Sequence, residues 1–214
     1  MITLSNVYKY YESVAVLNDV SFHVEKGELL FITGPSGAGK TTLLKLIFGS
    51  EIPDEGQIKV GEFELTKIKH SMIPHLRRFA TFIFQDFKLR QDLTVFDNVA
   101  LPLKIIGERD IKRKVIDVLK EVSLRHKSDS IVRTLSGGEQ QRVAIARAVV
   151  TNPKVILADE PTGNLDPQTS EDVFSLLKKI NAQGCTVLIA THNPDFFRNS
   201  PYRVLTLKEG KIIQ

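Results

Sequence analysis

One glycine-rich stretch of the chain has residue types and spacing that could bind a polyphosphate. It reads Gly34-Pro35-Ser36-Gly37-Ala38-Gly39-Lys40-Thr41-Thr42 and fits the pattern G-x-x-x-x-G-K-T. Glycines let the backbone fold around phosphate oxygens, and a helix that starts near Lys40 adds the positive end of its dipole. Lys40 can then reach the β- and γ-phosphates, and the Thr41 hydroxyl can coordinate Mg²⁺. The stretch predicts a nucleotide site.

A pair of carboxylates could supply the rest of the chemistry. Asp159 and Glu160 follow the apolar run 155–158. Such a run predicts a strand buried on both faces, and ligands of open α/β sheets bind at the carboxyl ends of the strands. We therefore expect Asp159 to hold Mg²⁺ and Glu160 to act as the general base toward the attacking water.

A second glycine loop, Leu135-Ser136-Gly137-Gly138-Glu139-Gln140, opens a predicted helix over 138–150. Ser136 is a good N-cap, and Glu139 stands where a capping box needs it. Two glycines just inside a helix cost about 1 kcal/mol each in helix propensity. The loop predicts a second helix terminus that phosphate approaches closely, and a merely well-capped helix is the alternative.

Hydrophobic periodicity predicts the elements that must position these residues. Alternating residues favour antiparallel strands over 2–8 and 18–25 and, after a break at 53–56, a hairpin over 57–65. Beyond them, strands alternate with helices, which indicates a parallel sheet with helices on its faces. The expected strands are 28–33, 80–84, 154–158, 185–190 and 202–207, and the expected helical segments are 71–78, 93–133, 138–150, 168–182 and 194–198.

The composition is that of a globular domain, with 42% hydrophobic and 25% charged residues. No apolar run approaches the roughly 18 residues that cross a bilayer, and the start lacks a signal-peptide pattern, so we expect a cytoplasmic chain. Cys185 is the only cysteine, which excludes an internal disulfide, and we expect it to be buried. Basic residues gather over 67–78 and 104–114. Such runs indicate solvated faces or, alternatively, surfaces that contact an anionic membrane or nucleic acid.

In their order and approximate spacing, the motifs resemble those of the ATP-binding-cassette (ABC) ATPases. The motifs are the loop 34–42, Gln85, the loop 135–140, Asp159-Glu160, Asn164-Leu165-Asp166 and His192. The resemblance covers essentially the whole chain and implies one nucleotide-binding domain over 1–214. The implied fold is an α/β P-loop NTPase core with an antiparallel β-subdomain and an α-helical subdomain at about 86–150. ATP and Mg²⁺ are the implied ligands.

The resemblance also implies roles for single residues. Tyr11 is similar to the aromatic residue that stacks on adenine, with Tyr10 as the alternative, and His192 is similar to a switch histidine that contacts the γ-phosphate. Gln85 resembles a glutamine that senses Mg²⁺ and the γ-phosphate, and Asp166 resembles a residue that couples two sites across a dimer. The implied catalytic residues are Lys40, Gln85, Glu160 and His192, the implied metal ligands are Thr41, Gln85 and Asp159, and the implied nucleotide-binding residues are Tyr11, Gly34, Pro35, Ser36, Gly37, Ala38, Gly39, Lys40, Thr41, Thr42, Gln85, Ser136, Gly137, Gly138, Glu139 and Asp166.

The implied assembly is a head-to-tail homodimer in which two ATP molecules lie between the 34–42 loop of one subunit and the 135–140 loop of the other. Segments 92–99, 163–166 and 202–207 are most similar to the family's bacterial cell-division ATPases, which implies an integral membrane partner and a peripheral place on the cytoplasmic face of the inner membrane. The ATPase of a lipoprotein-releasing or macrolide-type exporter is the alternative, since it shares 163–166. The chain departs from the division pattern in its short Tyr11 region and at Arg90-Gln91.

Two other classes of function are disfavoured. Nucleic-acid binding is not expected, because the chain has a single cassette and no heptad run. A cassette that clamps ATP without turnover is disfavoured by the presence of both Glu160 and His192.

Overall fold

Six strands form the central sheet of the computed structural model, which describes residues 1–198 and 200–213. Residues 199 and 214, which the predicted domain 1–214 includes, lie outside the described residues. The strand order is β10-β9-β3-β8-β7-β6. All pairs are parallel except β10 with β9. The strands are β3 (Leu29–Thr33), β6 (Ala80–Ile83), β7 (Val155–Asp159), β8 (Thr186–Ala190), β9 (Arg203–Lys208) and β10 (Lys211–Ile213).

A second, antiparallel sheet has the order β2-β1-β4-β5 and confirms the strands expected in the first third of the chain. Its members are β1 (Ile2–Tyr11), β2 (Val14–Val24), β4 (Glu55–Val60) and β5 (Phe63–Glu64). The expected break at 53–56 is wrong at its last two residues, which belong to β4. Gly56 has φ 87°, and a Cβ there would lie 2.2 Å from the Asn6 carbonyl oxygen. This glycine therefore permits a close approach of two strands rather than a chain break.

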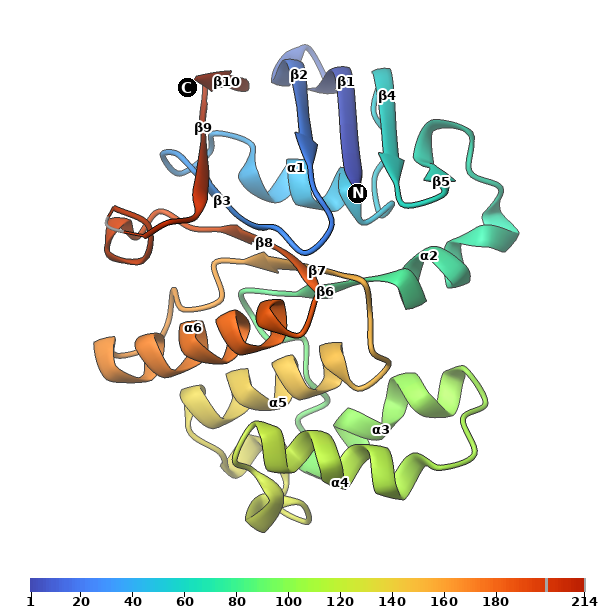
Figure 1. Ribbon diagram of the computed structural model, residues 1–214, viewed down its shortest axis with the longest axis vertical. Coiled ribbons are helices and arrows are strands. Elements are labelled where there is room, and N and C mark those ends of the chain that lie inside the picture. The colour runs from blue at the N-terminus through green and yellow to red at the C-terminus, as the bar shows by residue number, and fades with distance from the viewer. Residues whose placement is uncertain (199, 214) are drawn as a thin grey trace.

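The described residues form six α-helices, which are arranged around the parallel sheet (Figure 1). In Figure 1, α1 lies between the two sheets, α5 and α6 cover the opposite face, and α3 and α4 lie beyond α5. The helical pattern expected over 93–133 is two α-helices followed by short 3₁₀ turns. The helices are α1 (Lys40–Ile47), α2 (Ile73–Phe79), α3 (Val95–Ile105), α4 (Ile111–Glu121), α5 (Gly137–Val149) and α6 (Pro167–Ala182).

The parallel strands are buried on both faces, because successive side chains point to opposite sides of a strand. Phe31, Ile156 and Ile189 pack with the helices of one side, whereas Leu30 and Leu188 pack with α1 and the antiparallel sheet. The carboxyl ends of β3, β6 and β7 are thus held by core on two sides. None of the helices in the described residues is long and apolar enough to span a bilayer.

Candidate active site

The glycine loop connects β3 to α1, as its sequence predicts. Gly34 has φ 146° and Gly39 has φ 101°, both in the region that favours glycine. A Cβ at Gly34 would lie 2.0 Å from the Leu207 carbonyl oxygen, and one at Gly39 would lie 2.8 Å from that of Val16. The N-cap residue of α1 is Gly39, which has no side chain to cap the helix, so the N–H groups of the first turn are left for solvent or a ligand.

One cavity of about 640 Å³ unites this loop with the other predicted catalytic residues. Gln85 reaches it from the loop after β6, Glu160 from the end of β7 and His192 from the segment after β8. The lining is Val16, Pro35, Ser36, Gly37, Ala38, Gly39, Lys40, Thr41, Thr42, Gln85, Asp159, Glu160 and His192. Residues distant in sequence therefore meet because their strands are parallel and end at one edge.

Lys40 is the cation of this cavity, and its side chain is only 8% exposed. The Lys40 Nζ donates to the carbonyl oxygens of Gly34 at 2.8 Å and of Pro35 at 3.1 Å. It also lies 3.9 Å from the Glu160 Oε1. Its own loop thus satisfies a buried ammonium, which is held beside the place that a phosphate would take.

Glu160 and His192 form a hydrogen-bonded pair, with 2.8 Å between the Glu160 Oε1 and the His192 Nδ1. The Glu160 side chain is 11% exposed and that of His192 is 66% exposed. Glu160 has φ 45°, and its N–H donates to the Ala190 carbonyl at 2.9 Å. Left-handed backbone is uncommon for glutamate and concentrates at functional sites. This conformation places a carboxylate next to an imidazole at the mouth of the cavity.

The residues present fit a magnesium ion. Burial raises the pKa of the Asp159 carboxyl above its ordinary value, a hydrogen bond with Thr41 opposes this, and the Glu160 charge adds to it. The Asp159 Oδ1 is buried and has no hydrogen-bond partner within the described residues. Thr41 offers a hydroxyl, Gln85 an amide and Asp159 a carboxylate to this cavity. All three are oxygen ligands that Mg²⁺ accepts alongside phosphate and water. Residues 1–198 and 200–213 contain no cluster of three or more His, Cys, Asp or Glu side chains placed to hold a metal.

The second glycine loop and Asp166 lie outside this cavity. Ser136 forms the predicted capping box: its Oγ accepts from the Glu139 N–H at 3.3 Å, and Glu139 accepts from the Ser136 N–H at 2.9 Å. Asp166 caps α6, where its Oδ1 accepts from the Thr169 N–H at 3.0 Å. Ser136, Gly137 and Asp166 are exposed. A single chain therefore leaves these predicted binding residues at the surface.

The two glycines of the second loop differ in their surroundings. A Cβ at Gly138 would lie 2.4 Å from the Thr169 Cγ2, whereas one at Gly137 would lie 3.6 Å from the Leu165 Cδ2. The first distance is a clash and the second an ordinary contact. Ligand approach is thus not needed to explain Gly138, because α6 packs against it, and no local signal in the sequence indicates this contact.

Neither tyrosine considered for adenine lines the cavity. Tyr11 ends β1, and its hydroxyl hydrogen bonds with Glu51. The pKa of Tyr11 is raised by burial first and by Glu51 next, while a hydrogen bond with Thr42 lowers it. Tyr10 stacks on Tyr8, with 6.5 Å between ring centroids. The hairpin does contribute Val16, which the sequence reasoning missed and which only the register of β1 and β2 could have revealed.

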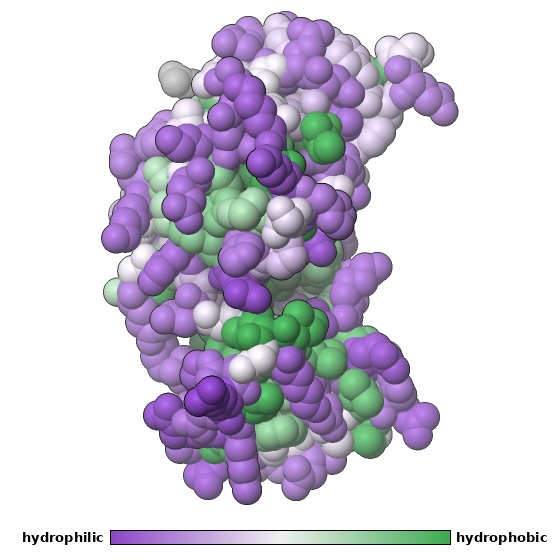
Figure 2. Space-filling model, turned by 90° about the vertical axis from the view of Figure 1, so that its right-hand side faces the viewer, coloured by the Kyte–Doolittle hydropathy of each residue, from purple (hydrophilic) through white to green (hydrophobic). Residues whose placement is uncertain are grey.

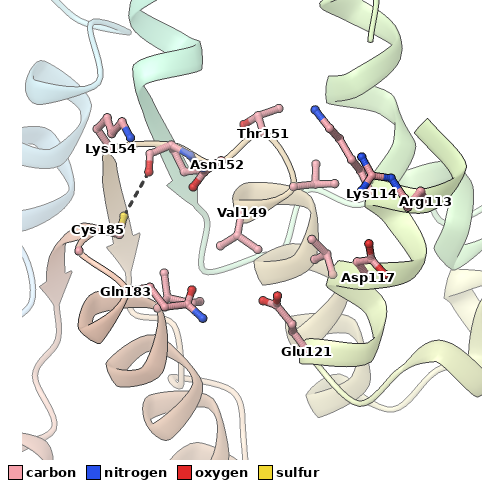
Figure 3. Close-up of a pocket in the computed structure, with 15 residues that line it drawn as sticks. Arg113, Lys114, Asp117, Glu121, Val149, Thr151, Asn152, Lys154, Gln183 and Cys185 are labelled. Atoms are coloured by element: carbon pink, nitrogen blue, oxygen red, sulfur yellow. Dashed lines mark hydrogen bonds between the residues drawn. The ribbon is translucent and has the colours of Figure 1, made fainter. Parts of the chain in front are cut away.

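A second cavity, of about 430 Å³, lies between α4, the end of α5 and the segments that open β7 and β8 (Figure 3). Figure 3 shows Asp117 and Glu121 of α4 on the side of the cavity opposite Gln183. Cys185 is buried there as predicted; its thiol donates to the Pro153 carbonyl at 3.5 Å, and burial raises its pKa to about 11. None of the predicted site residues lines this cavity.

The family model for the ABC transporter matches residues 17–163. Curated relatives named cell division ATP-binding protein FtsE align along nearly their full length. The protein from Bacillus subtilis is 48% identical over 100% of this chain and 95% of its own length. The Mycobacterium tuberculosis protein is 47% identical over 100% and 95%, and the Escherichia coli K12 protein 48% identical over 99% and 97%.

Solved structures with the same fold agree with these matches. A dimeric post-hydrolysis state of the ATP-binding cassette MJ0796, bound to ADP and Pi, has a TM-score of 0.91 at 36% identity and covers 100% of this chain and 97% of that one. A nucleotide-free cassette from an ABC transporter has a TM-score of 0.84 at 29% identity, covering 100% and 90%. The predicted fold class is confirmed. With a matching family model, full-length relatives and one cavity uniting its glycine loop and acidic strand end, the chain belongs to the ABC transporter family, as one of its ATP-binding, ATP-hydrolysing cassettes.

Proposed function

We propose that the chain is the ATPase subunit of a cell-division complex of the FtsE–FtsX type, peripheral to the cytoplasmic face of the bacterial inner membrane. One observation carries the ATPase part of this proposal: Lys40, Glu160 and His192 converge on a single cavity. The cell-division part is supported by the 47–48% identity to proteins named FtsE. In this proposal the chain is a single nucleotide-binding domain over 1–214, with the helical subdomain at about 86–150.

The cavity supports transfer of the γ-phosphoryl group of ATP to water. Glu160 accepts the proton of the attacking water, and His192 orients the Glu160 carboxylate through the 2.8 Å hydrogen bond. Lys40 exchanges its loop carbonyls for phosphate oxygens and offsets the charge that develops on them. Thr41, Gln85 and Asp159 would hold Mg²⁺, which when bound neutralises charge on the β- and γ-phosphates. Catalysis is then positioning and charge neutralisation within a preorganised cavity.

A second copy of the chain completes the site in this proposal. Ser136, Gly137, Gly138 and Glu139 stand at the start of α5, away from the cavity of their own chain. In a head-to-tail dimer they would close over the partner's ATP, with Asp166 at the junction and Tyr11 on the adenine. Two similar solved structures are described as dimeric cassettes, which supports this arrangement.

In this proposal the membrane partner docks in a groove of about 790 Å³ between α2, β6, α3 and α5. Figure 2 shows apolar surface in the hollow between the upper and lower parts of this side of the molecule. Ile105, on the α3 side of the groove, is 81% exposed. The apolar lining is Phe48, Ile73, Pro74, Phe82, Phe84, Leu101, Pro102, Ile105, Ile106 and Ala148, and the basic lining is His70, Arg77, Arg78, Lys88 and Arg147. We infer that an amphipathic segment of the partner with acidic residues docks here.

Glu160→Gln tests the catalytic assignment in the full chain purified with its membrane partner. Loss of a general base lowers turnover by about 100-fold or more, while ATP binding persists and the closed dimer accumulates. Steady-state ATP hydrolysis and size-exclusion chromatography with ATP measure these effects. Glu121→Gln, on α4 beside the other cavity, is the matched control and keeps wild-type turnover. Wild-type turnover in Glu160→Gln would remove Glu160 from the role of base.

Co-purification from the native membrane tests the cell-division role separately. A four-helix partner of the FtsX type is the expected result. A lipoprotein-binding complex in its place would assign the cassette to an exporter and leave the ATPase chemistry intact.

A further inference from the structure

The loop after β6, which carries Gln85, contains two consecutive non-glycine residues with left-handed backbone. Phe87 has φ 60° and Lys88 has φ 48°. The Phe87 N–H donates to the Phe84 carbonyl at 3.1 Å, and the Lys88 N–H donates to the Asp86 carbonyl at 2.6 Å. Such backbone persists only where the surrounding structure holds it. The contacts that hold this loop therefore decide where Gln85 lies.

Arg147, in the last turn of α5, supplies one such contact. Its Nη2 donates to the Phe87 carbonyl at 2.7 Å, and its Nη1 donates to the Lys88 carbonyl at 2.6 Å. The side chain is partly buried, and burial lowers the pKa of its guanidinium. Among the ion pairs of residues 1–198 and 200–213, none includes Arg147. The guanidinium is thus committed to backbone carbonyls, with the fixed fork geometry that favours arginine over lysine.

A second contact holds the far end of the same loop. Asn98 of α3 is fully buried, and its Oδ1 accepts from the Arg90 N–H at 2.9 Å while its Nδ2 donates to the Arg90 carbonyl at 2.9 Å. No hydrogen bond of the Gln85 side chain occurs within the described part of the chain. Gln85 therefore enters the nucleotide cavity from a loop whose next residues, 87–90, are hydrogen bonded to side chains of α3 and α5.

We propose that Arg147 is a positioning residue that sets Gln85 in the nucleotide cavity by holding the left-handed backbone of Phe87 and Lys88. This inference rests on the proposed ATPase function, in which Gln85 meets Mg²⁺. Ser136 caps the start of α5, and Arg147 lies in its last turn. The helix therefore connects the loop that would face the partner subunit to the loop that carries Gln85. Arg147 and Lys88 also line the apolar groove, so their hydrogen bond lies between the groove and the nucleotide cavity.

Arg147→Lys tests the proposal because it keeps the charge and loses the two-pronged hydrogen bond. The Phe87 and Lys88 carbonyls lose their fixed donors in the variant, so the loop opens more often and frees the N–H groups of both residues from the Phe84 and Asp86 carbonyls. Hydrogen exchange of a peptide covering 84–90 is therefore expected to accelerate. The Mg²⁺ concentration for half-maximal ATP hydrolysis is expected to rise by about 10-fold, the usual effect of losing support behind a metal ligand. Affinity for a fluorescent ATP analogue without Mg²⁺ should stay at the wild-type value.

Gln85→Ala separates positioning from a general loss of structure. If Arg147 acts through Gln85, Gln85→Ala raises the Mg²⁺ requirement, and adding Arg147→Lys raises it no further. Arg142→Lys is the matched control on α5: its guanidinium binds Asp172 at 2.8 Å, so exchange at 84–90 and the Mg²⁺ requirement should not change. Arg147→Gln, which removes the buried charge but keeps an amide donor, replaces Arg147→Lys if the latter does not fold.

The outcomes are distinct. Wild-type exchange and Mg²⁺ dependence in Arg147→Lys, or additive effects in the double variant, would overturn the positioning role. A wild-type chain that hydrolyses no ATP with its partner would instead overturn the proposed function, because the exchange experiment reports on the loop without any activity.

Discussion

Gly137 and Gly138, adjacent at the start of α5, are expected to respond differently to the same substitution by alanine. Alanine is the better helix former by about 1 kcal/mol, and this gain is similar at both positions. Only the new Cβ at position 138 meets a close neighbour, the Thr169 Cγ2 at 2.4 Å; at position 137 the nearest atom is 3.6 Å away. Any difference between the two variants therefore reports that contact.

The Thr169 side chain cannot easily turn away from the added methyl group. Its hydroxyl donates to the Asp166 Oδ2 at 2.5 Å, and its N–H donates to the Asp166 Oδ1 at 3.0 Å. Rotation about χ1 would break the first bond, which belongs to the cap of α6. Overpacking of a fixed site costs about 1–3 kcal/mol. The free energy of unfolding of Gly138→Ala should therefore fall below that of Gly137→Ala by about 1–3 kcal/mol.

Urea unfolding of the two variants, followed by circular dichroism without nucleotide, measures the difference. Thr169→Ser removes the clashing methyl group and keeps the hydroxyl for Asp166, so it should close most of the gap in the Gly138→Ala background. Gly137→Ala should be as stable as wild type. It should still lose ATP hydrolysis, because in the proposed dimer the added methyl group would meet the ATP bound to the partner subunit. Equal stability of the two alanine variants would refute the packing argument for Gly138.

Two more predictions concern the cavity. Lys40→Ala should weaken ATP binding by roughly 10-fold or more in a fluorescence titration, since a charged hydrogen bond contributes about 1.5–3 kcal/mol. Lys45→Ala, on the same helix but paired with Glu51, should leave the affinity unchanged, and equal affinities in both variants would contradict the phosphate role of Lys40. Asp159→Asn should raise the thermal midpoint without nucleotide and abolish Mg²⁺-dependent hydrolysis. The raised pKa of Asp159 means that the folded state holds its proton to a higher pH than the unfolded state does, so wild-type stability falls as pH rises from 3.8 through that pKa, and the advantage of the variant grows over the same window. An advantage that shrinks with rising pH would contradict the assigned cause.

The elements of the cassette could be predicted from the sequence wherever one physical signal dominates. The run 155–158 is apolar at every position because β7 is buried on both faces, so its end at Asp159 is plain. Val95, Val99 and Leu103 are spaced by four and are all buried, which confirms the amphipathic helix expected there. Ser136 and Glu139 form their capping box because both partners lie within one helical turn.

What the sequence could not reveal depends on contacts between distant segments. The Gly138–Thr169 contact, the place of Val16 beside the glycine loop and the bonds of Arg147 to the Gln85 loop each join residues of different elements. None of these has a local pattern, because Gly, Val and Arg occur in helices and strands for many reasons. The position of Tyr11 outside the cavity is a further case. It depends on how the hairpin 10–16 packs against α1, which is again a contact between different elements.

The strained backbone next to the cavity suggests why the site is built on this sheet. Glu160, Phe87 and Lys88 all have positive φ, and each such residue costs of order 1–3 kcal/mol. Glu160 follows β7 directly, and the Gln85 loop follows β6, two paired strands whose side chains are almost entirely buried. A rigid pair of strands fixes the start of each strained segment. Its continuation is fixed by the hydrogen bond that the Ala190 carbonyl accepts from Glu160 and by those that Arg147 donates to the Gln85 loop. Removing either support should therefore let the side chain drift before the fold itself is lost, which is why exchange at 84–90, rather than global stability, is the sensitive measure of how the site is held.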